Sequence, residues 1–351
     1  MILDKTKVGI IAYGTSIPQL VIQSEEIEQA QNKQNSGIPQ SLGVLQKTVP
    51  DIDEDTITLS TTAAFQALQR WNQDSSQIGA LFIGSESHPY AVKPSGTVVK
   101  QALGLSDKLA MADLQFACKA GTQSLQIVAS YVASGMIPVG LAIGADTAQS
   151  KPGDVLEFTA GAGAAAFVLG KQRLLARLIA TASIATDTPD FWRRPGQPFP
   201  EHAGRFSGQP AYYAHVSQAT KMLLREVKLE PAEIDWCVFH TPNAKFPKIV
   251  ASKLGFTSDQ LAPSLVVKKI GNTYAAASLL GLAAVLDQAK AGQKILVTSY
   301  GSGSGSDSFL FETTKELVSQ RKKWKNLVQD QISIVNSVSY STYSNNTKST
   351  H

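Results

Sequence analysis

The chain has 351 residues, of which 43% are hydrophobic and 17% are charged. This composition predicts a globular protein with one large core or two fused cores, and it excludes a highly charged disordered chain. The net charge of +4 is small and the basic residues are scattered, so we expect no nucleic-acid partner. The two cysteines, Cys118 and Cys237, are too few for a disulfide framework.

The N-terminus and the apolar segments bear on location. The first residues, MILDKTKVGIIAYG, place charges ahead of a short apolar run that soon reaches glycine, which favours a first strand over a signal peptide. Uncharged apolar segments of about 18 residues are absent from the sequence, so we expect no membrane span. With so few cysteines, these features predict a cytoplasmic protein.

Strands and helices alternate along both halves of the chain. In the first half we expect a strand VGIIAYG, a helix near 61–71, a strand ALFIG, a helix after Cys118 and a strand VGLAIGA. In the second half we expect a helix through 219–227, a strand DWCVF, a helix after Asn272 and a strand KILVTSYG. This alternation predicts an α/β fold.

Equal spacings indicate a duplicated unit. Glu86 follows a strand and precedes Cys118 by as many positions as His240, which also follows a strand, precedes Asn272. The same offset relates LAIGAD at 141–146 to ILVTSY at 295–300. Recurrence at a fixed offset predicts a pseudo-twofold core in which these four polar residues form two equivalent pairs.

The composition changes from Lys315 onward. KELVSQRKKWKNLVQDQ, at 315–331, predicts a basic helix with a solvated face, and we expect the Ser-, Thr- and Asn-rich tail SVSYSTYSNNTKSTH to be disordered. The predicted organisation is an N-terminal half at 1–170, a C-terminal half at 171–314, and a helix with a tail at 315–351.

Cys118 is a candidate nucleophile. It lies where a strand-like segment meets a Gly- and Ala-rich helix, which places its sulfur at a helix N-terminus. The positive end of the helix dipole favours the thiolate, so we expect a lowered thiol pKa. A small buried hydrophobic residue is the equally weighted alternative for Cys118. Cys237, inside the apolar run DWCVFH, is assigned to the core.

His240 and Glu86 are candidate acid–base groups. His240 ends a strand and precedes the turn residues TPN, a position that suits a general acid or base, although a surface or turn-capping histidine is the alternative. Glu86 follows a strand in the loop segment GSESHPYAVKP, where catalytic groups often lie, and an exposed loop carboxylate is the alternative. His88 competes with Glu86 for any role in this loop.

Two other patterns argue against phosphate-loop and metal sites. GSGSG at 301–305 lacks the Lys of a P-loop and the glycine spacing of a dinucleotide fingerprint, so it indicates close backbone approach at a strand end. The five histidines are dispersed and no Cys/His spacing is typical of zinc, so we expect no metal.

Seven segments together resemble the archaeal 3-hydroxy-3-methylglutaryl-CoA synthases. They span nearly all of residues 7–312, and they are GSESHPYAVKP, DLQFACKAGT, LAIGADTAQSKPGDVLEFTAGAGAAA, TDTPDFWRRPGQPFPEHAGRF, VFHTPNAKFP, IGNTYAAASLLGLAAVLD and SYGSGSGSDSF. GSES combined with FACKAG and FHxPNxKFP is specific to this branch. The resemblance implies a thiolase-like fold, with two pseudo-equivalent βαβαβαββ halves in a layered α-β-α-β-α sandwich.

The resemblance also implies a reaction. Cys118 would accept an acetyl group from acetyl-CoA, Glu86 would remove a methyl proton from it, and His240 would orient and protonate the acetoacetyl-CoA carbonyl. Water would then release 3-hydroxy-3-methylglutaryl-CoA, a step of the mevalonate route to isoprenoids. The enzyme would be an acyltransferase without a cofactor, its substrates CoA thioesters. The resemblance gives the binding residues as Asn272 for the second substrate, Lys245 for a CoA phosphate, and Thr159, Ser207 and Ser302 for the pocket, with backbone N–H groups near Cys118 and Ser302 as oxyanion donors.

Partners and departures follow from the same resemblance. It implies a homodimer and, as in archaeal members, a complex with an acetoacetyl-CoA thiolase and a small bridging protein of zinc-ribbon and OB-fold type. The sequence departs from the family pattern in HTPN where HQPN is usual, in Ile249 beside Lys248 where a basic residue is usual, and in its C-terminal tail.

Three alternative functions are open. The acceptor could be a β-ketone on an acyl carrier protein, because the same three groups would serve. A decarboxylating condensing enzyme like ketoacyl-ACP synthase III needs Cys, His and Asn but has no need of Glu86. An inactive scaffold that only binds partners is the third, against which the presence of Glu86, Cys118 and His240 argues.

Overall fold

The computed structural model describes residues 1–2, 7–147 and 150–349. Within these residues, nine strands form one sheet in the order β11-β12-β13-β8-β1-β7-β6-β4-β5. Within this sheet, every strand before residue 171 lies on one side of the β1–β8 contact, and every later strand lies on the other. The strands are β1 (Gly9–Ser16), β4 (Ile78–Gly84), β5 (Ala110–Leu114), β6 (Val139–Thr147), β7 (Ala162–Gly170), β8 (Ala176–Ala185), β11 (Trp236–Phe239), β12 (Lys294–Thr298) and β13 (Gly305–Thr313).

The two parts of the sheet repeat the same pairing. In the first part β4 is parallel to β6, while β6–β7 and β7–β1 are antiparallel. In the second part β11 is parallel to β12, while β12–β13 and β13–β8 are antiparallel. The predicted duplication is confirmed, with one difference. The first part has the additional edge strand β5, and the described residues contain no counterpart of it beyond β11.

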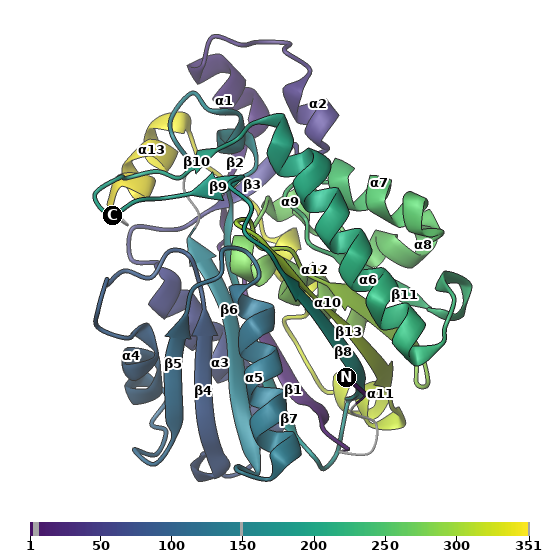
Figure 1. The fold of residues 1–351 in the computed structure, drawn as a ribbon. Helices are drawn as coiled ribbons and strands as arrows, with labels where there is room; N and C mark the ends of the chain where they lie inside the picture. The colour runs from purple at the N-terminus through teal and green to yellow at the C-terminus, as the bar shows by residue number, and fades with distance from the viewer. Residues whose placement is uncertain (3–6, 148–149, 350–351) are drawn as a thin grey trace.

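Helices complete five layers, as Figure 1 shows. α3 and α4 cover the outer face of the first part of the sheet, and α6 and α7 cover the outer face of the second. α5 and α10 contact each other and lie between the two parts. Every residue of α10 is buried, as expected for a helix that is apolar all round. The helices are α1 (Ser24–Ala30), α2 (Ile38–Leu42), α3 (Thr56–Trp71), α4 (Ser95–Ala102), α5 (Ala120–Ser134), α6 (Tyr213–Val227), α7 (Lys245–Leu254), α8 (Ser258–Leu261), α9 (Val267–Ile270), α10 (Ala277–Leu286), α11 (Lys315–Arg321), α12 (Val328–Ser333) and α13 (Tyr340–Ser349).

Local sequence explains how the central helix α5 begins and ends. Gly135 ends it in the left-handed conformation, with φ at 82°, a geometry that favours glycine. Gly121, in its first turn, lies against the segment that leads into α10, since a Cβ at this position would come within 2.2 Å of the Ala275 carbonyl oxygen. The glycine therefore permits the close contact between the two halves.

The C-terminal segment differs from the prediction. The expected basic helix at 315–331 is divided into α11 and α12, and the tail expected to be disordered forms β14 (Asn336–Ser337) and α13. β14 pairs with β2 (Leu20–Gln23), which pairs with β3 (Gln46–Val49). α13 lies beside α1, as Figure 1 shows at the top of the molecule. Residues 350–351 of the predicted tail lie outside the described residues.

One tyrosine explains why the tail folds. Tyr343 is buried against Ile22, Ile27, Val49 and Phe158. Its hydroxyl accepts a hydrogen bond of 3.0 Å from the buried Lys47 ammonium. Lys47 lies 296 positions earlier in the chain, and the apolar partners are also distant in sequence, so the local composition of the tail could not reveal them.

A bilayer-spanning helix is absent from the described residues, where each helix is too short or too polar to cross. A separate pair of short strands, β9 (Phe191–Trp192) and β10 (Glu201–His202), lies in the connection between β8 and α6.

Candidate active site

Cys118 and Glu86 lie in direct contact. Glu86 follows β4, and Cys118 lies just before α5. The Cys118 thiol donates a hydrogen bond of 3.2 Å to Glu86 Oε1. Ala117, immediately before the cysteine, has a positive φ of 42°, so the chain turns sharply just before Cys118. Cys118 is buried among apolar residues, and its thiol is in addition paired with a carboxylate.

Asp146 holds the Glu86 loop in place. It lies in β6, beside β4, and its side chain is fully buried. Its Oδ1 accepts hydrogen bonds from the Glu86 backbone N–H at 2.9 Å and from the hydroxyls of Ser85 and Ser87 at 2.7 and 2.6 Å. Its Oδ2 accepts one from the Ala275 N–H at 2.7 Å, which lies in the other half. One carboxylate therefore joins the loop that holds Glu86 to the segment that leads into α10.

Glu86 has a strongly raised pKa. Burial, followed by the nearby Asp146 carboxylate, raises the pKa of Glu86 to about 8. The interpretation of Glu86 as an exposed loop carboxylate is therefore wrong. A carboxylate of this basicity is matched to proton transfer near neutral pH.

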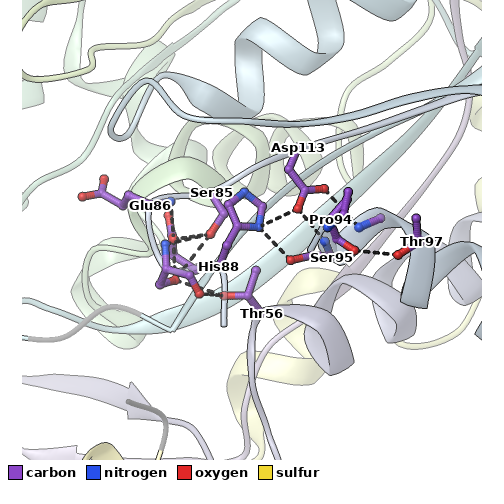
Figure 2. A network of polar contacts seen from close by, with 11 residues as sticks. Thr56, Ser85, Glu86, His88, Pro94, Ser95, Thr97 and Asp113 are labelled. Atoms are coloured by element: carbon purple, nitrogen blue, oxygen red, sulfur yellow. Dashed lines mark hydrogen bonds and ion pairs between the residues drawn. The ribbon is translucent and has the colours of Figure 1, made fainter. Parts of the chain in front are cut away.

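His88 does not compete with Glu86. Its Nδ1 is 2.9 Å from Ser95 Oγ and 3.4 Å from Asp113 Oδ2. Figure 2 shows the His88 ring turned toward Ser95 and Asp113, while the Glu86 carboxylate points the other way. The structure thus separates two candidates that the sequence could not rank.

The predicted lowering of the Cys118 pKa is wrong. Burial raises the pKa of this thiol well above its ordinary value, and the adjacent Glu86 raises it further. The sulfur precedes Lys119, the N-cap of α5, so it lies outside the first turn. Desolvation and a neighbouring carboxylate outweigh any effect of the helix terminus here. The thiol is therefore the favoured form of Cys118, and Glu86 accepts its hydrogen bond.

His240 lies at the equivalent position of the second half, directly after β11. It is 1% exposed, so the surface alternative is wrong. Burial lowers the pKa of His240 to about 3, and the imidazole is neutral at physiological pH. Its backbone is fixed by hydrogen bonds from its N–H to Thr298 O and from the Tyr212 hydroxyl to its own carbonyl. Its Nδ1 has no hydrogen-bond partner among the described residues.

Asn272 and Thr159 lie beside each other. The Asn272 N–H donates to the Thr159 carbonyl oxygen at 2.6 Å, and Ala160 forms a bridge with Asn272. Ala160 packs with Cys118 and Tyr274, so the segments that contain Thr159 and Asn272 lie close to Cys118. Hydrogen bonds do not join Asn272 or His240 to Cys118 within the described residues.

Ser302 and Ser207 belong to a loop network centred on Asp190. The fully buried Asp190 accepts hydrogen bonds on its carboxylate from Gly303 N–H at 2.7 Å and from the Tyr300 hydroxyl. Its carbonyl oxygen accepts one from the Ser207 hydroxyl at 2.6 Å. Ser207 therefore supports the Ser302 loop, and the Tyr300 ring packs beside His240 with centroids 6.4 Å apart.

A cavity of about 520 Å³ opens beside Glu86, and its lining does not include Cys118, His240 or Asn272. Glu86, Ala117, Tyr274 and Ser302 line it, together with Trp192 and Arg193 from the β9–β10 connection. A larger depression of about 980 Å³ lies between α3 and residues 316–326, and no predicted site residue lines it. The smaller cavity is therefore the one that predicted site residues line.

The remaining expectations concern Lys245 and metals. Lys245 begins α7 and is exposed, and the structure does not place it at the cavity. Clusters of three or more potential metal ligands from His, Cys, Asp and Glu are absent from the described residues.

The sequence interpretation missed Asp146, Tyr274, Arg193 and Asp190. Asp146 carried a detectable signal, because a carboxylate within an otherwise apolar strand needs partners. Tyr274 has a positive φ of 46° and contacts Cys118, a placement that only the folded chain reveals.

Comparisons with known proteins agree with this arrangement. Residues 224–313 match the family model of the 3-oxoacyl-[acyl-carrier-protein] synthase III C-terminal domain. The hydroxymethylglutaryl-CoA synthase of Methanopyrus kandleri is 50% identical over 92% of this chain and 92% of its own length. That of Methanocaldococcus jannaschii is 50% identical over 88% of this chain and 90% of its own length.

Solved structures give the same relationship. MvaS in complex with 3-hydroxy-3-methylglutaryl coenzyme A superposes with a TM-score of 0.89 at 25% identity, covering 97% of this chain and 91% of the other. A curacin-pathway HMG synthase in complex with acetyl donor-ACP superposes with a TM-score of 0.87 at 22% identity, covering 97% and 88%, which supports the fold alone. With half of its residues identical to those of the archaeal synthases over nearly its whole length, the chain belongs to the hydroxymethylglutaryl-CoA synthase family of acyltransferases with a thiolase-like fold.

Proposed function

We propose that Cys118, Glu86 and His240 carry the synthase reaction of this chain, joining acetyl-CoA to acetoacetyl-CoA. The hydrogen bond between the Cys118 thiol and Glu86 Oε1 is the observation that supports this assignment most strongly. Asn272, Thr159, Ser207 and Ser302 form the substrate pocket in this proposal, and the exposed Lys245 contacts a CoA phosphate.

The first step is acetyl transfer. The Cys118 sulfur attacks the acetyl-CoA carbonyl while its proton passes to the Glu86 carboxylate, and Glu86 then gives this proton to the departing CoA thiolate, which leaves as CoA and restores the carboxylate. Backbone N–H groups at Cys118 and Ser302 stabilise the tetrahedral oxyanion. The raised pKa of Cys118 leaves little free thiolate before the attack. The contact with Glu86, which accepts the thiol proton, therefore makes the step accessible.

The second step is condensation. The Glu86 carboxylate removes a methyl proton from acetyl-Cys118, and the resulting enolate attacks the ketone carbon of acetoacetyl-CoA. The neutral His240 ring hydrogen-bonds to the ketone oxygen and supplies its proton. Water then hydrolyses the thioester at Cys118, which regenerates the thiol and leaves a free carboxylate on 3-hydroxy-3-methylglutaryl-CoA.

This proposal and its nearest alternative differ in whether the acetoacetyl group is attached to CoA or to an acyl carrier protein. Acetyl-CoA and acetoacetyl-CoA should give 3-hydroxy-3-methylglutaryl-CoA, identified by mass spectrometry. Failure with acetoacetyl-CoA but turnover with acetoacetyl on an acyl carrier protein would move the acceptor to the carrier protein. Release of carbon dioxide from malonyl-ACP would indicate the decarboxylating class, and absence of any acetyl adduct would favour the scaffold.

A homodimer is part of the proposal. β5 pairs with β4 on one side, and its other edge has no strand partner in the described residues. An unpaired edge is a template for pairing with another chain, so a second copy is expected to extend the sheet at β5. Light scattering of the purified protein measures this directly. The family resemblance supports a complex with an acetoacetyl-CoA thiolase and a zinc-ribbon bridging protein, operation in the mevalonate route and independence of cofactors. The low cysteine content supports a cytoplasmic location.

A further inference from the structure

A buried ion pair joins the two halves directly behind the nucleophile. Lys119 follows Cys118, and its Nζ lies 3.0 Å from Asp307 Oδ2 in β13, with the two side chains 3% and 0% exposed. The Lys119 ammonium also donates to Gln123 Oε1 and lies 4.4 Å from the centroid of the Phe116 ring. Neither charge has a role in the proposed chemistry. Apolar residues of similar volume often stabilise a protein as well as a buried ion pair does, so stability alone does not account for these two charges.

Asp307 stands at the base of the hairpin that carries Ser302. Gly301 and Gly305 exchange backbone hydrogen bonds of 2.8 Å, which leaves Ser302 at the tip. Below them the Ser299 N–H donates to the Asp307 carbonyl oxygen at 2.9 Å. Thr122, in the first turn of α5, donates to Ser299 Oγ at 2.7 Å and to Asp307 Oδ2 at 3.1 Å. Thr122, at the start of α5, therefore hydrogen-bonds to both sides of the hairpin.

The hairpin also packs tightly on the nucleophile loop. A Cβ at Gly301 would come within 2.5 Å of the Phe116 carbonyl oxygen and 2.6 Å of Lys119 Cβ. A Cβ at Gly305 would come within 2.6 Å of the Phe116 ring. The backbones of residues 116–119 and 301–305 are thus in contact, and they come from opposite halves of the chain.

We propose that the Lys119–Asp307 ion pair is a positioning device that sets the distance between the backbone N–H of Cys118 and that of Ser302. This inference rests on the proposed function, in which these two N–H groups bind the oxyanion. Neither Lys119 nor Asp307 touches the substrate. The pair acts by locking the nucleophile loop of one half to the oxyanion loop of the other, since electrostatic stabilisation of an oxyanion depends on fixed donors.

Two reactions of the same sulfur separate this role from a merely structural one. Acetylation by acetyl-CoA passes through a tetrahedral oxyanion, whereas alkylation by iodoacetamide displaces iodide and forms none. In Asp307→Asn we expect acetylation of Cys118 to slow by at least about tenfold, since loss of an oxyanion donor costs roughly 10²–10³. Alkylation of Cys118 should stay within about twofold of wild type, and so should the KM for acetyl-CoA, because binding does not use the oxyanion donors.

Further variants keep the test informative if Asp307→Asn fails to fold. Lys119→Met/Asp307→Leu removes both charges together, which buried pairs tolerate, and it should show the same selective loss of acetylation. Lys119→Arg retains the charge and should acetylate faster than Lys119→Met. Glu312→Gln is the matched control, because it removes a carboxylate from the same strand but from the more exposed pair with Arg177, and both reactions should be unchanged.

Equal slowing of acetylation and alkylation would overturn the inference, because the pair would then orient the sulfur itself. Unchanged acetylation in the double variant would overturn it as well, and the pair would be structural only. Absence of an acetyl adduct in the wild-type protein would instead overturn the proposed function, a result distinct from both.

Discussion

Glu86 and His240 occupy equivalent positions in the two halves, at the ends of β4 and β11, and burial acts on them in opposite directions. The pKa of Glu86 is raised to about 8 and that of His240 is lowered to about 3. Glu86 has Cys118 as a partner, whereas His240 Nδ1 has none among the described residues. The duplicated fold supplies two matching positions, and in the proposed mechanism the first half carries the acetyl chemistry and the second half binds the acceptor.

The largest expected effect comes from removing the nucleophile of the first half. Cys118→Ala should lower synthase turnover by at least about 10⁴-fold, since loss of a catalytic nucleophile has effects of this order. Intact-protein mass spectrometry should then show no acetyl adduct. Cys237→Ala, which removes the other thiol, should keep the adduct. An adduct that persists in Cys118→Ala would place the nucleophile elsewhere.

Glu86→Gln should have the next largest effect. Condensation should fall by roughly 10³-fold, within the range for loss of a general base. Acetylation of Cys118 should slow as well, because Glu86 also accepts the thiol proton, and the acetyl-Cys118 that does form should persist, because the step that consumes it is blocked. Rapid quenching followed by mass spectrometry measures the acetylated fraction. Turnover near the wild-type rate in this variant would transfer the role of base to another group.

His240→Ala should affect the second half alone. Acetylation of Cys118 by acetyl-CoA should continue near the wild-type rate, while condensation falls by roughly 10²-fold, the lower end for loss of a positioned acid. Single-turnover experiments separate the two steps. A loss of acetylation as large as the loss of condensation would contradict the division between the halves.

Tyr343→Ala tests whether the C-terminal segment folds onto β2 and β3. Removing the buried ring should lower the free energy of unfolding by roughly 3 kcal/mol, as for other buried aromatic residues, and it leaves Lys47 without its hydrogen-bond partner. Tyr340→Ala, which removes a hydroxyl contact of 2.8 Å to Glu157, is a milder companion variant. Denaturant titration measures both. A stability equal to that of wild type would mean that α13 does not fold on β2 and β3 in solution.

The pH dependence of stability should differ in sign between the halves. Because the folded pKa of Glu86 is raised from 4.5 to about 8, its contribution to stability is present below pH 4.5 and is lost as the pH rises toward 8. Because the folded pKa of His240 is lowered from 6.5 to about 3, its contribution is present above pH 6.5 and is lost as the pH falls.

Difference measurements isolate these two groups. Relative to wild type, Glu86→Gln should gain stability as the pH rises from about 5 to 8, and His240→Asn should gain it as the pH falls from about 6.5 to 4. Each slope is on the order of 1 kcal/mol per pH unit. Urea titrations at each pH give the differences, and a flat difference for either variant would mean that its group titrates normally.

The sequence predicted the repeated α/β architecture because strand periodicity and residue spacing are local properties. It also placed Glu86, Cys118, His240 and Asn272 at strand or helix ends, which the structure confirms. Spacing could not rank Glu86 against His88, since their difference lies in side-chain direction.

Two expectations failed for one physical reason. The Cys118 pKa was expected to fall, but desolvation and Glu86 raise it, and both are properties of the folded environment. The tail was expected to be disordered, but Tyr343 finds its partners near the N-terminus. Composition and spacing report local tendencies, whereas these outcomes depend on contacts between distant segments.

Exchange of the acetyl methyl hydrogens tests the division of labour most directly. The protein is loaded with trideuterated acetyl-CoA without an acceptor, and the mass of the Cys118 adduct is followed in ordinary water. The account predicts that the adduct loses deuterium in wild type and in His240→Ala and keeps it in Glu86→Gln. Retention of deuterium in His240→Ala with continued exchange in Glu86→Gln would contradict the assignment of the base to the first half.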